Sequence, residues 1–467
     1  MVEVKSFQYL DNLIHSGEKE VSLEYDIILE EDEEEKYNEG ITLDVQDLIL
    51  DGNGHSIDAQ EKSRIFNIKS RVKFKNLILK NGYSDDYGGA ICVFNSWLSS
   101  FENCSFKNNH ANMGGAFFSK EHRDITFSNC QFTNNYGIGG ALFCNTGRFN
   151  INKCSFKNIQ SKKVNDGSAI VIAGGSNVTI TNSIFYNNCS EYNGGAIYIH
   201  ENNKVLIDES VFEENRSLHA GGAIYNRKGN LTIKGTSFIK NYSLKEKQDE
   251  ELDCYTSYRG YTREEVDEMI NIYDKGGAAI CNDTGSITVI DSKFHLNKSA
   301  NKGGALYNNN GTITLLESEL YDNHSLSDDG IYNKDGTVIL MDDKIKYTLE
   351  SSNYSLLKNF RGNMIITDSV LDYDENSSID YINYGHYGFI MIKNTKVGEK
   401  FVESFTNWLY FFLNYVVAND EFKLLLYKPL IKLFETFLSL FILNINDILI
   451  PFLVTIISAL TSFASFK

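Results

Sequence analysis

The clearest group of side chains that could carry out chemistry lies early in the chain, at Asp51, His55 and Asp58. A glycoside hydrolase needs two carboxylates that face one sugar, about 5–5.5 Å or about 6.5–9.5 Å apart. On a fold of stacked coils, such carboxylates would occupy matching outward positions in neighbouring coils. The run Asp51-Gly-Asn-Gly-His55 is instead typical of a turn between strands, so we predict no catalytic residue here.

Three cysteines, Cys104, Cys130 and Cys154, recur at intervals of 26 and 24 residues. If each interval formed one coil, the thiols would stack, and such a column could bind a soft metal or form one disulfide. Serine or threonine takes the same place in later repeats, which favours a simple requirement for a small interior side chain. Eight cysteines in 467 residues are also too few to indicate a fold held together by disulfides. We therefore expect no metal and no cofactor.

Motifs of other functional classes are missing from the sequence. There is no H-E-x-x-H, P-loop, G-x-S-x-G or dinucleotide-binding glycine motif, and His200-Glu201 lacks the second histidine of a zinc protease. The net charge of −18, from 44 Lys and Arg against 62 Asp and Glu, argues against nucleic acid as a partner. The aromatic content of 13% argues against a disordered chain.

A repeated element spans most of the chain and must position any functional side chain. Its mark is Gly-Gly-Ala, mostly followed by an apolar residue, with weaker copies at Gly167 and Gly330. Successive copies lie 26, 25, 28, 27, 27, 55, 27 and 27 residues apart. The strong copies begin at Gly88, Gly114, Gly139, Gly194, Gly221, Gly276 and Gly303.

Three further positions run in phase with the glycines. An apolar residue, mostly phenylalanine, marks each repeat at Phe106, Phe132, Phe156, Phe185, Phe212, Phe238, Phe294 and Leu320. Three residues later, except at Ile159, stands an asparagine: Asn109, Asn135, Asn188, Asn215, Asn241, Asn297 and Asn323. Two residues before the apolar residue stands a small side chain: Cys104, Cys130, Cys154, Ser183, Ser210, Thr236, Ser292 and Ser318.

These phased positions predict a solenoid. Alternating runs such as Val178-Thr-Ile180 precede many of the phenylalanines and are typical of short strands. A repeat of about 27 residues with several such strands and no helix fits one coil of a parallel β-solenoid. Coils pair about 4.8 Å apart, so equivalent residues form columns. We expect a stack of phenylalanines, turn asparagines that tolerate positive φ and bond through their amides, and Gly-Gly turns where a Cβ would clash.

The segment before the repeat, residues 1–39, is predicted to be an N-terminal cap with an acidic loop. Ser6 to Gly17 reads as a helix that would cover the strand edge of the first coil, with one apolar face formed by Phe7, Leu10, Leu13 and Ile14. The six consecutive acidic residues from Glu30 to Glu35 read as a solvated loop, since they lack the glycine and spacing of a calcium-binding loop.

Residues 40–395 are predicted to form the parallel β-helix, interrupted once by a charged insertion at 245–275. The interval of 56 residues between Phe238 and Phe294 equals one coil plus this insertion. Part of the insertion, Arg263 to Ile270, reads as helix. Loops that leave a rigid scaffold often carry function, and the alternative is an insertion that the fold merely tolerates.

Residues 396–467 are predicted to form a hydrophobic α-helical region. One helical face carries Phe401, Phe405, Trp408, Leu409, Phe412 and Leu413. The segment 448–466 holds no charged residue and is long enough for a membrane-spanning helix. We expect a membrane anchor here, with a pair of buried helices that cap the main domain as the alternative. Met1 to Gly17 holds no unbroken apolar run, so we expect no signal peptide of the usual kind.

Four stretches of the sequence resemble the opening coils of archaeal adhesin-like proteins. They are Gly40-Ile-Thr-Leu43, the run from Leu48 to Asp58, Arg64-Ile-Phe-Asn-Ile68, and the run from Phe74 to Gly82. The Gly-Gly-Ala-Ile and Ser-x-Phe-x-x-Asn repeats are similar to those of the same proteins and of polymorphic outer-membrane proteins. The resemblance covers roughly residues 1–395. It implies a right-handed parallel β-helix of the pectate-lyase-like type, displayed at the cell surface.

The predicted function is that of a non-catalytic, adhesin-like protein that binds glycans or cell-surface proteins along its stacked coils. Its location would be the membrane or the cell surface. One alternative is a polysaccharide lyase or glycoside hydrolase on the same fold. Another is a cytoplasmic solenoid that assembles through its C-terminal helices. We assign only structural turn and ladder positions: Gly88, Gly114, Gly139, Gly194, Gly221, Gly303, Asn109, Asn135, Asn188, Asn215, Asn241, Asn297 and Asn323.

Asn-x-Ser/Thr sequences are frequent and would allow glycosylation only if the chain left the cytoplasm. They include Asn177, Asn215, Asn230, Asn241, Asn297 and Asn323. Most of these asparagines belong to the repeat, which explains them without glycosylation.

Overall fold

The computed structural model describes residues 4–94, 98–121, 124–161, 167–243, 275–325, 329–347, 355–373, 382–384, 389–397 and 400–406. The chain divides into two units, Met1–Phe405 and Thr406–Lys467, and the fold described here is that of the first. The predicted membrane anchor at 448–466 lies outside the described residues, as do residues 244–274 of the predicted insertion. No helix within the described ranges is long and apolar enough to cross a lipid bilayer.

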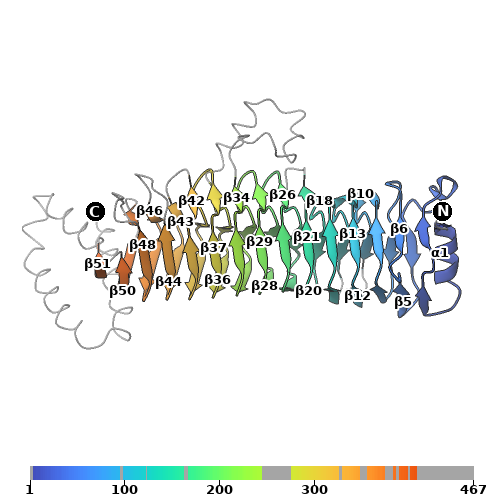
Figure 1. Ribbon diagram of the computed structural model, residues 1–467, viewed down its shortest axis with the longest axis horizontal. Coiled ribbons are helices and arrows are strands. Elements are labelled where there is room, and N and C mark those ends of the chain that lie inside the picture. Colours follow the sequence, from blue (N-terminus) through green and yellow to red (C-terminus); the bar gives the residue numbers. More distant parts are fainter. Residues whose placement is uncertain are drawn as a thin grey trace, which may run out of the picture. The chain divides into compact units, whose positions relative to one another are not determined.

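The described chain winds into a parallel β-helix, so the predicted β-solenoid is confirmed, while most of the predicted C-terminal helical region lies outside the described residues (Figure 1). A typical coil contains four strands, which we number one to four by the stack that each joins in successive coils. Every strand pairs in parallel with its equivalent in the next coil. One such coil runs through β12 (Leu98–Glu102), β13 (Ser105–Lys107), β14 (His110–Met113) and β15 (Phe117–Lys120).

The first two stacks form one continuous sheet. The first stack continues through β2 (Glu20–Ser22), β5 (Leu48–Asp51), β8 (Val72–Lys75), β16 (Asp124–Ser128), β20 (Arg148–Asn152), β24 (Asn177–Thr181), β28 (Lys204–Asp208), β32 (Asn230–Lys234), β36 (Ser286–Ile290), β40 (Thr312–Leu316), β44 (Thr337–Met341), β47 (Asn363–Thr367) and β50 (Phe389–Val397). The second continues through β1 (Val4–Ser6), β3 (Asp26–Ile28), β6 (Ser56–Asp58), β9 (Ile78–Lys80), β17 (Gln131–Thr133), β21 (Ser155–Lys157), β25 (Ile184–Tyr186), β29 (Val211–Glu213), β33 (Ser237–Ile239), β37 (Lys293–His295), β41 (Glu319–Tyr321), β45 (Lys344–Tyr347) and β48 (Val370–Tyr373).

The other two stacks are separate sheets. The third stack continues through β10 (Tyr83–Tyr87), β18 (Tyr136–Ile138), β22 (Gln160–Ser161), β26 (Cys189–Ser190), β30 (Arg216–Ser217), β34 (Tyr242–Ser243), β38 (Lys298–Ser299) and β42 (His324–Ser325). The fourth continues through β4 (Ile41–Leu43), β7 (Phe66–Ile68), β11 (Ile91–Phe94), β19 (Leu142–Asn145), β23 (Ile170–Ala173), β27 (Ile197–Ile199), β31 (Ile224–Arg227), β35 (Ile280–Asp283), β39 (Leu306–Asn309), β43 (Asp329–Asn333), β46 (Ser355–Asn359) and β49 (Ile382–Tyr384).

The core is built from columns of identical or similar side chains, one from each coil. From Phe106 to Phe294, successive phenylalanine rings of the second stack lie 4.5–4.9 Å apart between centroids, with planes within 9° of parallel. All these rings are fully buried. Burial of apolar surface is the main stabilising term of folding, and here each coil extends the same columns. The predicted internal aromatic stack is confirmed.

The strand register corrects two glycine positions of the predicted repeat. Ile224 pairs with Ile280, so the residue equivalent to Gly221 is Gly277 and not Gly276. Gly277 has φ +78°, in the same left-handed region as Gly221 at +64°. The weaker copy at Gly330 is out of phase, because the Ala305 N–H donates to the Gly330 carbonyl and the two lie at equivalent places. A short glycine motif marks the turn, but the hydrophobic residue after it sets the register.

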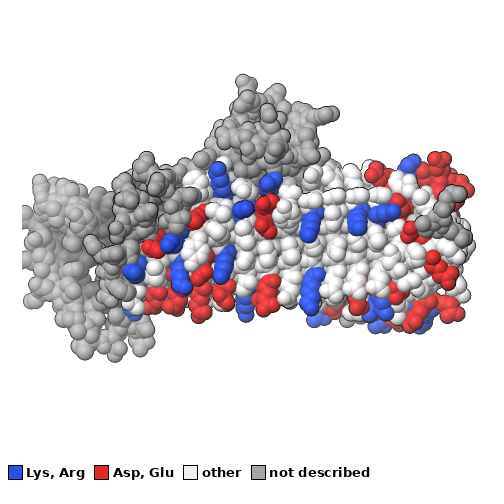
Figure 2. Space-filling model, in the orientation of Figure 1, with Lys and Arg blue, Asp and Glu red and all other residues white. Residues whose placement is uncertain are grey.

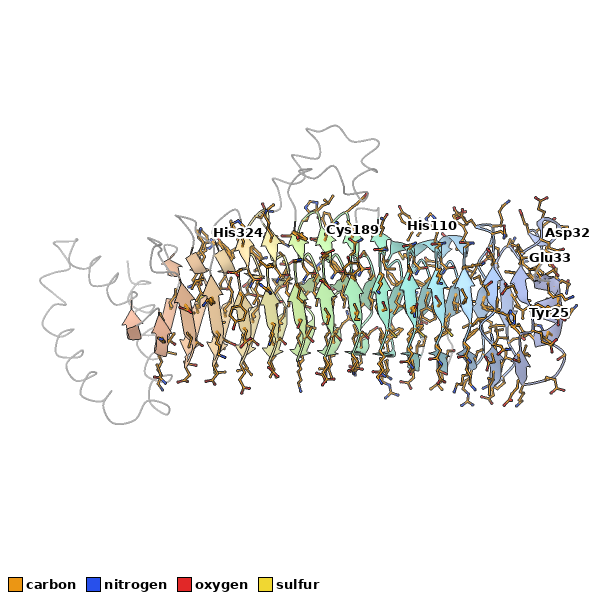
Figure 3. The ribbon with its side chains drawn as sticks, in the orientation of Figure 1. Tyr25, Asp32, Glu33, His110, Cys189 and His324 are labelled. Atoms are coloured by element: carbon orange, nitrogen blue, oxygen red, sulfur yellow. The ribbon has the colours of Figure 1, made fainter. Side chains whose placement is uncertain are left out.

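The N-terminal cap contains helix α1 (Phe7–Ile14), which buries Phe7, Leu10 and Ile14, while Leu13 is only partly buried. Ser6 is its N-cap, with the Oγ accepting from the Tyr9 N–H at 3.3 Å. The acidic run contains a short 3₁₀ helix, η1 (Glu31–Glu33). Figure 3 places Glu33 at the end of the β-helix that carries α1.

Glu33 departs from the predicted solvated loop, because it is only 9% exposed. Its carboxylate accepts the Phe7 N–H at 3.0 Å, the Gln8 N–H at 2.7 Å and the Glu30 N–H at 3.2 Å. The first N–H groups of a helix lack partners within the helix, and a carboxylate at this end is also favoured by the helix dipole. One member of the acidic run is therefore a structural part of the cap.

Strands continue beyond residue 395, the predicted end of the β-helix. β50 extends to Val397, and β51 (Lys400–Thr406) follows. Phe401 and Phe405 lie in this strand and not on the predicted helix. Apolar residues four apart fit a helical face, but they also fit one face of a strand, where side chains alternate. The remaining members of the predicted face, from Trp408 onward, lie outside the described residues.

Candidate functional site

Two columns of buried asparagine flank the core and shape the surface above them. The first asparagine ladder lies at the turn from the second to the third stack and consists of Asn109, Asn135, Asn188, Asn215, Asn241, Asn297 and Asn323. In Asn241, the Oδ1 accepts both the backbone N–H and the Nδ2 of Asn215, each at 3.0 Å. Its Nδ2 donates to Asn297 Oδ1 and to the Phe212 carbonyl, both at 2.9 Å. Each amide thus joins neighbouring coils through several hydrogen bonds.

Positive φ falls one residue before these asparagines, which corrects the expected backbone position. Asn108, Asn134 and Asn187 have φ between +52° and +54°. Later coils place Glu214, Lys240, Leu296 and Asp322 in the same conformation. The exposed turn residue therefore takes the left-handed conformation, while the ladder asparagine keeps a negative φ and turns its amide inward.

The Gly-Gly turns connect the third stack to the fourth. The first glycine of each pair, at Gly88, Gly114, Gly139, Gly194, Gly221 and Gly303, has φ between +57° and +65°. A Cβ at any of these positions would overlap with the backbone carbonyl oxygen three residues later. Glycine is the residue type that this turn accepts without strain.

A second asparagine ladder was not predicted from the sequence. It lies at the turn from the fourth to the first stack and consists of Asn226, Asn282, Asn308, Asn333 and Asn359, all fully buried. Each Nδ2 donates to the Oδ1 of the next member at 2.8–3.0 Å. Each Nδ2 also donates to the carbonyl of the glycine three residues later, at 2.7–3.1 Å. The phased pattern Asn-x-x-Gly was visible in the sequence and could have identified it.

The glycines of this pattern hollow the surface into a groove that we call the glycine groove. A side chain on Gly285 or Gly311 would overlap with the ladder amides beneath. The groove has a volume of about 690 Å³ and crosses the turns of five successive coils. Its lining consists of Asn202, Asn203, Lys204, Lys228, Gly229, Asn230, Thr284, Gly285, Ser286, Asn310, Gly311, Thr312, Asp335, Gly336 and Thr337.

The chemistry of the glycine groove is polar and nearly neutral. Amides and hydroxyls, which both donate and accept hydrogen bonds, make up most of its side chains. The charged groups lie towards its two ends, and two of them are paired. Lys228 is 3.6 Å from the Glu201 carboxylate, and Asp335 is 2.7 Å from the Arg361 guanidinium. Such a surface suits an uncharged ligand rich in hydroxyl groups.

Asp51 and Asp58, the nearest candidates for catalysis, are the last residues of strands β5 and β6 and bond to the turns that follow. The Asp51 Oδ1 accepts the Asn53 N–H and the Asn76 Nδ2, both at 3.0 Å. Asp58 makes the equivalent pair of contacts and also an ion pair with Lys80. His55 lies 3.5 Å from the Asp26 carboxylate, on a different strand. The carboxylates of Asp51 and Asp58 are therefore engaged in contacts that stabilise turns.

The cysteine column lies in the interior, and Cys104, Cys130 and Cys154 are free thiols. Burial raises the pKa of the Cys130 thiol, and its Sγ lies 3.4 Å from the carbonyls of Phe101 and Ser128. Over the described ranges, no group of three or more His, Cys, Asp or Glu side chains could hold a metal ion. A buried, protonated thiol is unreactive, which fits a packing role.

One charged cluster lies where the chain returns from the predicted insertion. The Lys275 Nζ contacts the Asp283 carboxylate at 2.8 Å and the Tyr225 hydroxyl at 3.0 Å. Burial alone would raise the pKa of the Asp283 carboxyl, but hydrogen bonds from Lys275 and Asn309 outweigh burial and lower it. This cluster holds one carboxylate and not the facing pair that glycoside hydrolysis needs. It ties the returning chain to the fourth stack.

The surface beyond the groove carries charge unevenly. In Figure 2, acidic side chains gather at the end of the β-helix that carries the N-terminus, where the run Glu30 to Glu35 lies.

Of the Asn-x-Ser/Thr asparagines, Asn177 and Asn230 are exposed, while Asn215, Asn241, Asn297 and Asn323 are buried in the first ladder. Those four amides are engaged in hydrogen bonds and are closed to modification in the folded chain.

A comparison with protein-family models agrees with the fold. Residues 37–238 match a family model described as right handed beta helix region. The match covers the earlier coils, and the later coils continue the same register through β50. Among solved structures, the chain is similar to PfbA, a surface adhesin of Streptococcus pneumoniae, at 12% identity and a TM-score of 0.39, over 85% of this chain and 93% of that chain. No curated protein sequence matches the chain.

Proposed function

We propose that this β-helix is a non-catalytic binding protein that holds an extended, uncharged glycan along the glycine groove. The observation that carries the proposal is the groove itself, a hollow of about 690 Å³ in which five successive coils present amides and hydroxyls in line. Coils repeat about every 4.8 Å, a distance close to the length of one sugar residue in an extended chain. Each coil would therefore meet one residue of the ligand.

Binding along such a groove gains strength from repetition. Hydrogen bonds from one coil to one sugar are weak, because water competes for the same groups. Contacts on neighbouring coils are linked through the ligand, so each new contact forms at a high effective concentration. The rigid stack holds the binding groups in place before the ligand arrives, which reduces the entropy lost on binding.

The test is a titration of the full chain with linear, neutral oligosaccharides of increasing length, followed by calorimetry. Affinity should rise with length and level off near the number of coils in the groove. Thr312→Trp should weaken binding at least about tenfold, since an indole would fill the groove. The matched control is Thr314→Trp on the same strand, whose side chain lies outside the groove lining.

Three results would overturn the proposal. One is affinity that does not depend on oligosaccharide length. Another is an equal loss of binding in the two tryptophan variants. The third is the appearance of reducing or unsaturated sugar ends when pectic or other polysaccharides are incubated with the chain, which would reveal the alternative of a carbohydrate-active enzyme.

A cell-surface or membrane-associated location is part of the same proposal. A glycan-binding surface meets its ligand most directly outside the cell, and the predicted C-terminal anchor would hold it there. Cell fractionation with and without detergent, combined with protease treatment of intact cells, tests the location. Protection of the chain in intact cells and recovery in the soluble fraction would contradict it and favour a cytoplasmic assembly.

A further inference from the structure

A second, smaller pocket lies on another edge of the β-helix, at the third stack. We call it the tyrosine pocket. It has a volume of about 310 Å³, at the lower end of the range for small-molecule sites. The side chains that line it and carry its chemistry are those of Glu61, Tyr83, Asn108, His110, Asn134 and Tyr136. In Figure 3, His110 lies on the same edge of the β-helix as Cys189 and His324, which belong to later strands of the third stack.

The strands of the third stack explain why aromatic side chains gather here. Tyr83 pairs with His110, and His110 pairs with Tyr136, so the three occupy one column. The next residue in β14, Ala111, is buried, and so is Ser161 at the corresponding position of β22. Because side chains alternate along a strand, the column of Tyr83, His110 and Tyr136 faces outward.

The rings of this column meet edge to face. His110 and Tyr83 have centroids 5.3 Å apart and planes at 83°, and His110 and Tyr136 have centroids 4.4 Å apart and planes at 82°. Edge-to-face contacts are favourable for aromatic rings and hold the three side chains in fixed positions. Tyr136 is half-buried, and burial raises the pKa of its hydroxyl to about 12, so the group is a neutral phenol at physiological pH.

The polar side of the tyrosine pocket is supplied by turns. Asn108 and Asn134 have φ of +54° and +53°, the conformation that directs these turn residues outward from the first asparagine ladder. Glu61, with φ +59°, contributes an exposed carboxylate from the preceding coil. Within the part of the chain that the structure describes, neither the Glu61 carboxylate nor the Asn134 amide makes a side-chain hydrogen bond or ion pair.

The geometry points to a site for a single neutral sugar residue at the tyrosine pocket. A sugar ring has a face of C–H groups that packs on aromatic rings and a rim of hydroxyls that both donate and accept hydrogen bonds. The aromatic column offers the first kind of contact. The two amides and the carboxylate offer the second, since an amide both donates and accepts and a carboxylate accepts. This site is separate from the glycine groove and does not rest on binding there.

A cationic ligand is the competing occupant, because aromatic rings beside a carboxylate also bind ammonium groups. Such sites surround the cation with ring faces. Here the His110 ring is nearly perpendicular to the rings of Tyr83 and Tyr136. The three rings therefore pack edge to face against one another and do not surround a common centre with their faces. The row of amides on the other side also matches hydroxyl groups better than an alkylammonium group.

The proposal is tested with the full chain by saturation-transfer NMR and calorimetry, using glucose, galactose, mannose and N-acetylglucosamine as probes. At least one should bind. Tyr136→Ala should weaken that binding roughly tenfold, the loss expected when one aromatic contact is removed. The matched control is Tyr242→Ala, because Tyr242 occupies the same outward column of the third stack, in β34, but lies outside the pocket.

A second variant covers the case in which Tyr136→Ala does not fold. Asn134→Gly deletes one amide while keeping a residue that accepts positive φ, and it should also weaken binding. The proposal is overturned if none of the four sugars binds, if Tyr242→Ala reduces binding as much as Tyr136→Ala, or if tetramethylammonium binds at the pocket and the sugars do not. Thr312→Trp must leave this binding unchanged, so failure here and failure of the groove proposal are distinguishable.

Discussion

The two asparagine ladders use the same buried amide but support different surfaces. Above the first ladder, the turn residues carry side chains that are exposed, as in Asn134 and Lys240, or partly exposed, as in Glu214. Above the second, the glycines at Gly229, Gly285, Gly311 and Gly336 leave the turn hollow, and the glycine groove results. The ladder therefore secures the coil, while the residues placed over it decide what the surface can bind.

The bonding of the two ladders also differs in a way that can be measured. In the first ladder, an Oδ1 that follows another asparagine accepts both the backbone N–H and the side-chain amide of that residue, as Asn241 does from Asn215. In the second, the Oδ1 of Asn282 accepts only the Nδ2 of Asn226 among the contacts described. Loss of a first-ladder asparagine therefore also leaves a backbone N–H without its acceptor. We expect substitutions in the first ladder to lower the stability of the fold more than substitutions in the second.

Asn241→Ala is expected to have the largest effect. It leaves the Asn215 N–H without its acceptor in a dry interior and removes one hydrogen bond each from the Asn215 amide, the Phe212 carbonyl and the Asn297 Oδ1. Each buried polar group left unpaired costs about 1–3 kcal/mol, so after relaxation we expect a loss of about 4 kcal/mol. Urea unfolding followed by circular dichroism measures it. A loss below about 1 kcal/mol would show that the ladder is not a main source of stability.

Asp343→Ser should raise stability by about 3 kcal/mol at pH 8. Asp343 continues the column of small residues between Ser318 and Ser369, and it accepts the Ser318 N–H at 2.7 Å. Burial, opposed by hydrogen bonds from Ser318 and Met341, raises its pKa to about 7. One unit of pKa shift corresponds to about 1.4 kcal/mol. A serine keeps the acceptor and removes the buried charge.

The pH dependence of Asp343 has a definite sign. Its folded-state pKa of about 7 lies above the 3.8 of an ordinary aspartate, so the folded chain holds the proton more tightly than the unfolded chain. Its contribution to stability is complete below about pH 4 and is lost as the pH rises to about 7. Asp343→Ser should abolish this part of the pH profile. An unchanged profile in the variant would assign the dependence to other groups.

Asn282→Ala should cost about 2 kcal/mol, about half the effect at Asn241. The lost amide leaves the Asn308 Oδ1 without its donor and removes one of two donors from the Gly285 carbonyl, which keeps the Thr312 N–H. The open groove above Gly285 lets water replace part of the lost bonding. Measuring the two alanine variants side by side under one set of conditions sharpens the comparison between the ladders. Equal losses would mean that the groove gives the second ladder no access to water.

Ile159→Asn should have the smallest effect. Ile159 interrupts the first ladder, and its N–H donates to Asn188 Oδ1 at 3.1 Å. An asparagine at position 159 would join the two segments of the first ladder, because its Oδ1 would accept the Nδ2 of Asn135. This added hydrogen bond offsets the lost apolar burial. We expect a cost below about 1 kcal/mol, against about 3 kcal/mol for Ile207→Asn at a core position without a ladder. Similar costs at both positions would contradict this reading.

The coil could be predicted well from the sequence because the same residue pattern recurs in each repeat. The phenylalanine, small-residue and first-ladder positions each recur in phase, so chance matches average out. Single features were harder to predict. Glu33 differs from its acidic neighbours only through its place beside the N-terminus of α1, and nothing in the acidic run marks it. Phe401 and Phe405 fit a helix and a strand equally well over so short a stretch.

The candidate sites were less predictable than the fold for a physical reason. The glycine groove exists because four Asn-x-x-Gly turns lie side by side, yet each of them alone has the sequence of an ordinary turn. The tyrosine pocket combines Glu61, His110 and Asn134, which lie in three different coils and belong to no shared motif. Columns follow from periodicity, whereas a pocket depends on which unlike residues neighbouring coils bring together.

All the amides of both ladders point in one direction along the solenoid. Where the following coil also carries a ladder asparagine, the Nδ2 donates to its Oδ1, from Asn109 to Asn135 in one ladder and from Asn226 to Asn282 in the other. The aligned dipoles give the stack an electrical polarity, with oxygens facing the N-terminal coils and N–H groups facing the C-terminal coils. Asn226 Oδ1, the first oxygen of its ladder, has no hydrogen-bond partner in the described part of the chain. A coil grafted before it must therefore bring a donor.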